Sequence, residues 1–159
     1  MGRQVTANVS QSFEQWLSCA VRYLARWDRT AAQVEQFLRD KGASPVQVQR
    51  TINRLSELRY LNDHAYAVRW LERRLARKPM GRERLKAELL ATGVGEFVAE
   101  GAISEALRGV DEEVLARRAL TIKRGSGNRL PLVKAVRLLR QRGFEEDTID
   151  RMIGSHGGE

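Results

Sequence analysis

Apolar positions recur along this chain with the spacing of amphipathic helices, and the same arrangement returns three times at intervals of about fifty residues. Aligning Gly42, Gly93 and Gly143 brings nine apolar residues into register. These lie eight and four positions before each glycine and ten positions after it: Val34, Leu38, Ile52, Leu85, Leu89, Ile103, Ala135, Leu139 and Ile153. Nine matches at fixed offsets indicate a tandem helical repeat, and these residues are its predicted core.

Each repeat is predicted to contain three helices. The second helix of a repeat ends at the aligned glycine, which takes the left-handed conformation that closes a helix without a Cβ clash. A third helix follows at once, and in the first repeat Ser44 and Pro45 are its expected N-cap and first residue. The helices that open the repeats are expected at 13–27, 63–77 and 112–124. Three residues are expected as N-caps at or near helix starts: Thr30, Asn62 and Asp111.

The pattern therefore predicts an all-α protein, built as an elongated tandem array of three three-helix repeats. Such an array buries its apolar stripes repeat against repeat rather than in one central core. The expected divisions are an N-terminal tail at 1–12, repeats at 13–61, 62–110 and 111–154, and a C-terminal tail at 155–159. Gly125 to Asn128 lengthen the first connection of the third repeat, and we expect a mobile loop there.

Composition limits the classes of function. Cys19 is the single cysteine, so no internal disulfide is possible, and no apolar stretch has the length of a signal peptide or a membrane span. We therefore expect a cytoplasmic protein. His64 and His156 are the only histidines, and neither Cys-x-x-Cys nor His-Glu-x-x-His spacing occurs. We expect neither an enzyme nor a protein that holds a metal ion or another cofactor.

The distribution of charge points toward a binding function. The chain has 28 basic and 20 acidic residues, a net charge of +8. Eight basic and three acidic residues lie at 64–92, and nine basic and three acidic residues lie at 111–143. The last helices of the second and third repeats are instead net negative. Basic groups thus gather on the first two helices of two repeats, as expected of a surface that meets a polyanion.

Arginine predominates in this basic surface. Arg69, Arg73 and Arg77 are spaced by four and form one ridge of a helix whose opposite side is apolar. Because arginine makes bidentate contacts with phosphate and with carboxylate, the ridge suits a nucleic acid or an acidic protein groove. The full set of candidate binding residues is Arg69, Arg73, Arg74, Arg77, Lys78, Arg82, Arg84, Arg117, Arg124 and Lys134. Six aromatic residues fall on or beside apolar faces and are expected in the core rather than on bases: Trp16, Tyr23, Trp27, Tyr66, Trp70 and Phe97.

The second repeat resembles a known family. The residues that carry the resemblance are Tyr60-Leu61-Asn62-Asp63, Tyr66-Ala67, Arg74, Gly81, Arg84-Leu85, Glu88-Leu89 and Gly93. Together they are similar to the RecX regulatory proteins, and the likeness extends over roughly residues 13 to 153. That family is built of three tandem three-helix repeats, in agreement with the periodicity. Arg59 departs from the pattern, because the family usually has glycine before the Tyr-Leu pair, and this bears on the geometry of that helix end.

The resemblance implies a non-enzymatic regulator of the recombinase RecA. It implies binding in the helical groove of the RecA filament on DNA, with inhibition of strand exchange and of the coupled ATPase, in DNA recombination, DNA repair and the SOS response. Position by position it supports only Arg74, Gly81 and Arg84 as site residues. The expected partners are the RecA filament and, as a further option, single- or double-stranded DNA directly. We expect a monomer that does not bind membranes.

A stand-alone DNA-binding protein is the alternative, because three-helix units with a short turn resemble helix-turn-helix modules. The last helix of the second repeat has the wrong charge for a recognition helix, with Glu96, Glu100 and Glu105. The last helix of the first repeat, with Arg50 and Arg54, stays an option. A third interpretation is a scaffold whose arginines only keep it in solution, which predicts weak binding to every partner.

Overall fold

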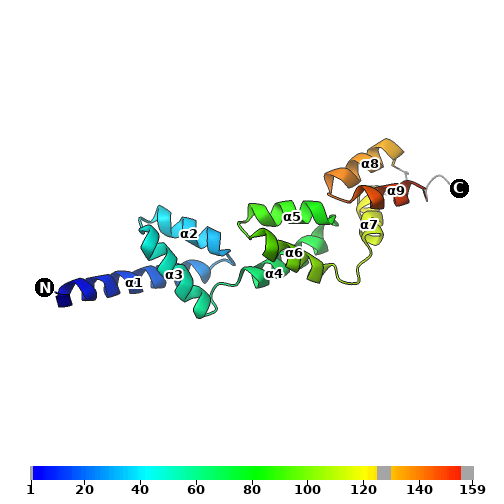
Figure 1. Ribbon diagram of the computed structural model, residues 1–159. Coiled ribbons are helices and arrows are strands. Elements are labelled where there is room, and N and C mark those ends of the chain that lie inside the picture. The colour runs from blue at the N-terminus through cyan, green and yellow to red at the C-terminus, as the bar shows by residue number, and fades with distance from the viewer. Residues whose placement is uncertain (1, 125–129, 155–159) are drawn as a thin grey trace. The chain divides into compact units, whose positions relative to one another are not determined.

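The structure is a computed structural model that describes residues 2–124 and 130–154, with side chains at 12–122 and 130–154. The described chain is helical, with nine α-helices and no strand (Figure 1). The prediction of an all-α protein is confirmed. The connection at Gly125 to Asn128, where a mobile loop is expected, lies outside the described residues. None of the described helices is both long enough and apolar enough to cross a membrane.

The helices fall in three groups of three along the sequence. Their bounds are α1 Gly2–Leu24, α2 Ala31–Asp40, α3 Pro45–Glu57, α4 Asp63–Arg77, α5 Arg82–Ala91, α6 Glu96–Ala106, α7 Glu112–Arg124, α8 Leu132–Gln141 and α9 Glu146–Gly154. The predicted bounds of α4 and α7 are confirmed. The expected range 13–27 is wrong at both ends for α1. No proline or glycine stands between Arg3 and Trp27 to stop a helix before Phe13, and the chain leaves the helix early enough for Thr30 to cap α2.

The aligned glycines end helices as predicted. Their φ angles are 97° at Gly42, 93° at Gly93 and 73° at Gly143, all in the left-handed region. The N–H groups just after two of these glycines fold back onto carbonyls of the preceding turn. Ala43 N donates to Leu38 O at 3.0 Å, and Phe144 N donates to Leu139 O at 3.2 Å. These bonds satisfy carbonyls that the end of a helix would otherwise leave open.

The predicted repeat core is confirmed. Of its nine residues, seven are buried, and only Ala135 and Ile153 of the third repeat are half-buried. The buried face of the third helices also includes the positions six and nine residues after each glycine: Val48, Thr51, Ala99, Ala102, Ile149 and Met152. The register found in the sequence therefore describes the inward faces of the second and third helices in all three repeats.

Side-chain caps fix where helices begin. Thr30 and Ser44 each form a capping box, with Gln33 and Gln47 as the reciprocal partners. Asn62 Oδ1 accepts from Ala65 N at 3.0 Å, and Asp111 Oδ1 accepts from Glu113 N at 2.9 Å. All four expected caps are confirmed.

Arg59 stands at the end of α3, at the position where the family pattern usually has glycine. Its φ is 61°, the only positive φ of a non-glycine residue in the described chain. Tyr60 N donates to Leu55 O at 2.8 Å, the bond that a left-handed residue makes possible at a helix end. Arg59 therefore adopts the conformation that glycine favours, against the preference of its own side chain.

The chain forms two compact units. One ends at Tyr66 and includes Thr92–Val94, and the other comprises Ala67–Ala91 and the chain from Gly95 onward. In the first unit, α1, α2 and α3 pack around Val34, Leu38 and Leu55. The buried Thr30 hydroxyl donates to Thr92 O at 2.8 Å, which holds the segment after α5 in this unit.

In the second unit, the start of α5 and the end of α8 approach closely at two glycines. Gly81 N donates to Arg142 O at 2.8 Å, and a Cβ built on Gly81 would collide with the backbone of Gly143. A Cβ on Gly143 would in turn collide with the backbone of Arg84. Only glycine fits both positions, so the start of α5 and the end of α8 are pressed backbone to backbone.

Glu112 and the buried Arg142 make further contacts near the start of α5 and the end of α8. The Glu112 carboxylate accepts from Arg82 N at 3.4 Å and from the Thr148 hydroxyl at 2.7 Å, so one side chain links α5, α7 and α9. Arg142 is 7% exposed, and its guanidinium donates to Pro79 O at 3.3 Å. Burial lowers the pKa of Arg142 below its usual range, because removal from water disfavours the charged form.

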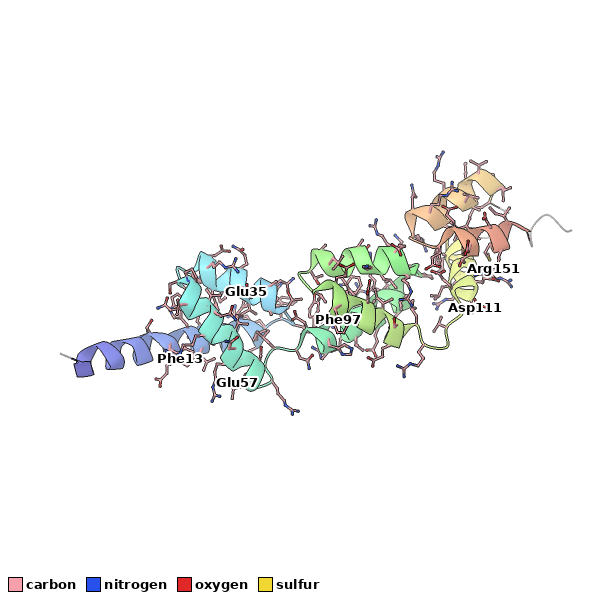
Figure 2. All side chains as sticks on the ribbon, viewed as in Figure 1. Phe13, Glu35, Glu57, Phe97, Asp111 and Arg151 are labelled. Atoms are coloured by element: carbon pink, nitrogen blue, oxygen red, sulfur yellow. The ribbon has the colours of Figure 1, made fainter. Side chains whose placement is uncertain are left out.

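The aromatic residues depart from the prediction at two positions. Trp27 is 65% exposed and Phe97 is 89% exposed, and Figure 2 shows Phe97 on α6. Trp27 lies past the end of α1, where helical periodicity no longer predicts its direction, and Phe97 lies in the first turn of α6 on its open side. Tyr66 is buried as expected, and Trp70 is half-buried.

Candidate binding surface

The helix α4 separates apolar and basic residues onto two faces. Ala67 and Leu71 are fully buried. Arg69, Arg73 and Arg77 are exposed at spacings of four and share the other face. The ridge predicted from the sequence is therefore present as a geometric feature of α4.

Arg74 lies at the border between the two faces and is held by α5. Its Nε donates to Glu88 Oε2 at 2.8 Å, and its second guanidinium nitrogen donates to Glu88 Oε1 at 3.0 Å. This fork-to-fork geometry is the strongest form of an arginine–carboxylate contact. The side chains are 32% and 20% exposed, so solvent screens the pair only in part.

Glu88 also pairs with a second arginine. Arg84 Nε donates to Glu88 Oε1 at 2.8 Å, one helical turn away on α5. Hydrogen bonds from Arg74, and then from Arg84, lower the pKa of Glu88 below its usual range against the opposing effect of burial. One carboxylate thus fixes two guanidinium groups, each of which keeps donors that it does not use for Glu88.

A depression lies beside the pair formed by Arg74 and Glu88. Four residues of α4 and one of α5 line it: Trp70, Arg73, Arg74, Arg77 and Glu88. Arg73 and Arg77 form no salt bridge within the described residues, whereas Arg74 is oriented by Glu88. The depression therefore presents two guanidinium groups without carboxylate partners beside a third that is fixed. This arrangement suits an anionic ligand such as a phosphate or a carboxylate.

The remaining candidates of the second repeat differ in their surroundings. Lys78 is exposed just after α4. Arg82 is half-buried, and its guanidinium donates to the Ser104 hydroxyl at 3.3 Å. The fold thus brings Arg73, Arg74 and Arg77 together around the depression, links Arg84 to them through Glu88, and turns Arg82 toward α6.

Candidates in the third repeat are more dispersed. Arg117 is exposed and lies 3.7 Å from Glu113, which also pairs with Arg151 at 2.8 Å. Lys134 is exposed on α8. The side chain of Arg124 lies outside the described residues. No described contact joins Arg117 or Lys134 to the arginines of α4.

Acidic residues of α6 are neutralised from α5. Lys86 Nζ lies 2.7 Å from Glu96 Oε1 and 2.7 Å from Glu100 Oε1. Hydrogen bonds that Lys86 donates to Glu100 and Glu96 raise the pKa of Lys86 above its usual range, and the contact with Lys86 lowers the pKa of Glu96. Lys86 is thereby engaged and adds nothing to the open basic surface. No cluster of three or more potential metal ligands occurs in the described part of the chain.

The role of Glu88 was not predicted from the sequence. It lies fourteen positions from Arg74, on another helix, so no periodicity links the two residues. The spacing of four between Arg84 and Glu88 was the available signal, since such pairs meet on a helix surface.

Family profiles of known proteins match the first two groups of three helices in this chain. The profile of the RecX first three-helix domain matches residues 17–55, and that of the RecX second three-helix domain matches residues 62–103. The regulatory protein RecX of Pelodictyon phaeoclathratiforme is 31% identical over 141 residues, which cover 86% of this chain and 86% of that protein. The regulatory protein RecX of Chlorobaculum tepidum is 32% identical over 140 residues, 86% of this chain and 85% of that protein.

Solved structures agree in fold. RecX from Lactobacillus salivarius superimposes with a TM-score of 0.73 at 24% identity, over 92% of this chain and 97% of that one. Another regulatory protein RecX superimposes with a TM-score of 0.79 at 20% identity, over 94% of this chain and 76% of that one. The family profiles and the sequence relatives lead to the same assignment, and the chain belongs to the RecX family of regulatory proteins.

Proposed function

We propose that this protein binds the RecA recombinase filament on DNA and inhibits strand exchange and the coupled ATPase, as a non-enzymatic cytoplasmic regulator that acts as a monomer. The observation that supports this most directly is the basic face of α4. There Arg73 and Arg77 have no carboxylate partner in the described chain, and they flank a depression in which Glu88 orients Arg74. A protein that used its arginines only for solubility would neutralise them with nearby acids.

The dimensions of α4 suit an extended contact. Its 15 residues span about 22 Å, and Arg69, Arg73 and Arg77 are spread over three successive turns of one face. Such a row offers phosphate or carboxylate groups several points of contact along one line. In this proposal α4 supplies the main contact with the filament, and Arg74 and Arg84 are positioned for it by Glu88.

Basic residues of the third repeat extend the proposed surface. Arg117 and Lys134 are exposed on α7 and α8, and we assign them, with Arg124, a supporting role toward acidic protein groups or DNA phosphates of the filament. Lys78 and Arg82 continue the charge between α4 and α5. Arg117 and Arg82 contribute less than the α4 ridge, because both already have partners in the fold.

The arginines of α3 do not favour a stand-alone DNA-binding function. The Arg54 guanidinium pairs with Glu57 at 3.0 Å, and the Arg50 guanidinium lies 4.4 Å from the centre of the Phe13 ring. Arg54 is neutralised within the first unit, and the Phe13 ring fixes the direction of Arg50. A recognition helix would instead direct such side chains at base edges.

The test is hydrolysis of ATP by RecA on single-stranded DNA during titration with this protein at substoichiometric levels. We expect the wild-type protein to suppress hydrolysis, and the triple variant Arg69→Glu, Arg73→Glu, Arg77→Glu to lose that effect. The matched control reverses three exposed arginines elsewhere, Arg39→Glu, Arg108→Glu and Arg118→Glu, with the same change in net charge. It is expected to inhibit like the wild type.

Two outcomes contradict the proposal. Equal loss of inhibition in both triple variants would mean that net charge, and not the α4 ridge, carries the effect. No inhibition by wild-type protein at equimolar ratio, together with tight and steeply salt-dependent binding to bare DNA, would favour the stand-alone DNA-binding function instead.

A further inference from the structure

The first unit carries a second basic surface, which joins cations to aromatic rings. Tyr23 of α1 and Phe37 of α2 stack with their ring centres 4.0 Å apart and their planes within 3°. The Arg29 guanidinium lies 5.3 Å from the centre of the Tyr23 ring, and Lys41 Nζ lies 5.8 Å from the centre of the Phe37 ring. Since the two rings face each other, the cations lie at opposite ends of the stack.

These cations are oriented by rings and not by acids. Neither Arg29 nor Lys41 forms a salt bridge within the described residues, and Nε of Arg29 is buried without a hydrogen-bond partner. A cation over a ring face is held in place by the quadrupole of the ring while its charge stays available to an external anion. The stack therefore fixes two positive charges that the fold itself does not neutralise.

An exposed indole lies in the same segment. Trp27 stands between Arg26 and Arg29, and 65% of its surface is accessible to solvent. Arg22 and Arg26 are exposed as well, and Asp28 is the single acidic residue at 22–29. Tryptophan is highly buried on average, so a tryptophan left this open beside three arginines calls for an explanation by binding.

We propose that this surface binds single-stranded nucleic acid directly, with the Trp27 indole stacked on an unpaired base and with Arg26, Arg29 and Lys41 in contact with backbone phosphates. The combination of an open aromatic face with a basic surface is the one that single-strand-binding proteins use. This site lies in the first compact unit, whereas the α4 ridge lies in the second, so the proposal goes beyond the regulatory function proposed above.

The chemistry favours a single strand over two other polyanions. In a duplex the bases are stacked on one another, so their faces are closed to an indole, and only the phosphate contacts would form. An acidic peptide would pair with the arginines but offers no planar group for Trp27. A single strand offers both an unpaired base for the Trp27 indole and backbone phosphates for Arg26, Arg29 and Lys41.

The experiment measures binding of the full-length protein to fluorescein-labelled oligo(dT) of twenty nucleotides by fluorescence anisotropy, without RecA. Trp27→Ala is expected to weaken binding about tenfold, since loss of one base–aromatic stack has about this effect. Trp27→Phe is expected to keep most of the affinity. Phe97→Ala is the matched control, because it removes an aromatic ring that is even more exposed, and it is expected to change affinity less than twofold.

A charge reversal at Arg26 and the fluorescence of Trp27 supply two further measurements of binding. Arg26→Glu is expected to weaken binding and to flatten its salt dependence, whereas Arg137→Glu, at an exposed arginine of α8, is expected to have a much smaller effect on both. In the double variant Trp16→Phe, Trp70→Phe, emission comes from Trp27 alone, and oligo(dT) is expected to quench it. This measurement does not depend on the folding of a Trp27 variant.

Three results would overturn the assignment. They are unchanged affinity of Trp27→Ala, absence of quenching in the variant that keeps only Trp27, and equal affinity for oligo(dT) and for a duplex of the same length. None of these results bears on inhibition of RecA through α4, so failure of this proposal and failure of the proposed function are distinguishable.

Discussion

Arg59 shows how a single backbone angle carries a cost that sequence periodicity cannot reveal. The chain needs a left-handed residue directly after the end of α3, and it uses arginine there, with φ at 61°. For residues with a Cβ this conformation costs roughly 1–2 kcal/mol, because the Cβ approaches the following carbonyl oxygen. Glycine avoids the clash but loses more conformational entropy on folding.

We therefore predict that Arg59→Gly stabilises the protein by about 0.5–1 kcal/mol, the difference between relief of the clash and the entropic cost of glycine. Urea denaturation followed by circular dichroism would measure the free energy of unfolding. Arg54→Gly is the control, because Arg54 lies inside α3 and glycine there is expected to destabilise by about 1 kcal/mol. Destabilisation by both variants would contradict the left-handed geometry at Arg59.

Glu88 supports a prediction about pH. Because Arg74 and then Arg84 lower the pKa of Glu88 in the folded state, its carboxylate stabilises the protein at any pH above its unfolded pKa. That stabilisation is lost as the pH falls through the lowered, folded pKa. At neutral pH, Glu88→Gln is expected to destabilise by about 1 kcal/mol, a modest value because both partners are partly exposed to solvent.

Denaturation series at several pH values would follow the difference in free energy of unfolding between Glu88→Gln and wild type. The difference is expected to be present at pH 7 and to shrink toward zero in acid. Glu72→Gln, at an exposed position of α4, is the control and should show a small difference throughout. A penalty for Glu88→Gln that persists at acid pH would mean that shape rather than charge explains the effect.

At the scale of elements, two glycines determine how α5 meets the end of α8. The backbones at Gly81 and Gly143 approach so closely that neither position has room for a Cβ. Gly143 also has a φ of 73°. A side chain here must push two helices apart, since its neighbours are main-chain atoms that cannot rotate away.

Gly143→Ala is therefore expected to destabilise the second unit by about 3 kcal/mol or more, the sum of a backbone clash and an unfavourable φ. Gly101→Ala is the matched control. Gly101 lies inside α6 with open space where a Cβ would stand, so alanine there is expected to stabilise by about 0.5–1 kcal/mol. Thermal denaturation of both variants measures the contrast, and similar melting temperatures would contradict the close approach of α5 and α8.

How much the sequence predicts also depends on scale. The spacing of apolar residues and the residues at helix ends predicted the helices and their buried faces. These features depend on residues three or four apart or on a cap beside its helix. Contacts between helices were not predictable in this way. The pairing of Arg74 with Glu88 and the meeting of Gly81 with Gly143 join residues that no helical period relates.

The candidate site follows the same division. The ridge of Arg69, Arg73 and Arg77 is a property of one helix, so the sequence located it. Its orientation by Glu88 is a property of two helices and emerged only from the structure. Trp27 was assigned to the core because its spacing continues the apolar stripe of α1, but the helix ends at Leu24 and the side chain is exposed beyond it.

For the whole molecule, the two proposed surfaces lie in different compact units and use different chemistry. Trp27 belongs to the first unit and the α4 ridge to the second. If the units carry separate contacts, a substitution in one should leave the contact of the other intact, because sites without shared partners act additively.

We predict that Trp27→Ala weakens binding to oligo(dT) about tenfold while the protein concentration that half-inhibits RecA stays within about twofold of wild type. The triple reversal at Arg69, Arg73 and Arg77 should show the converse. Reversal lowers net charge and weakens all polyanion binding somewhat, so its affinity for oligo(dT) is compared with that of the variant reversed at Arg39, Arg108 and Arg118. Equal affinities of these two triple variants, with loss of inhibition only in the first, would separate the surfaces. Parallel loss of both activities in Trp27→Ala would mean that single-strand binding is itself the route to inhibition.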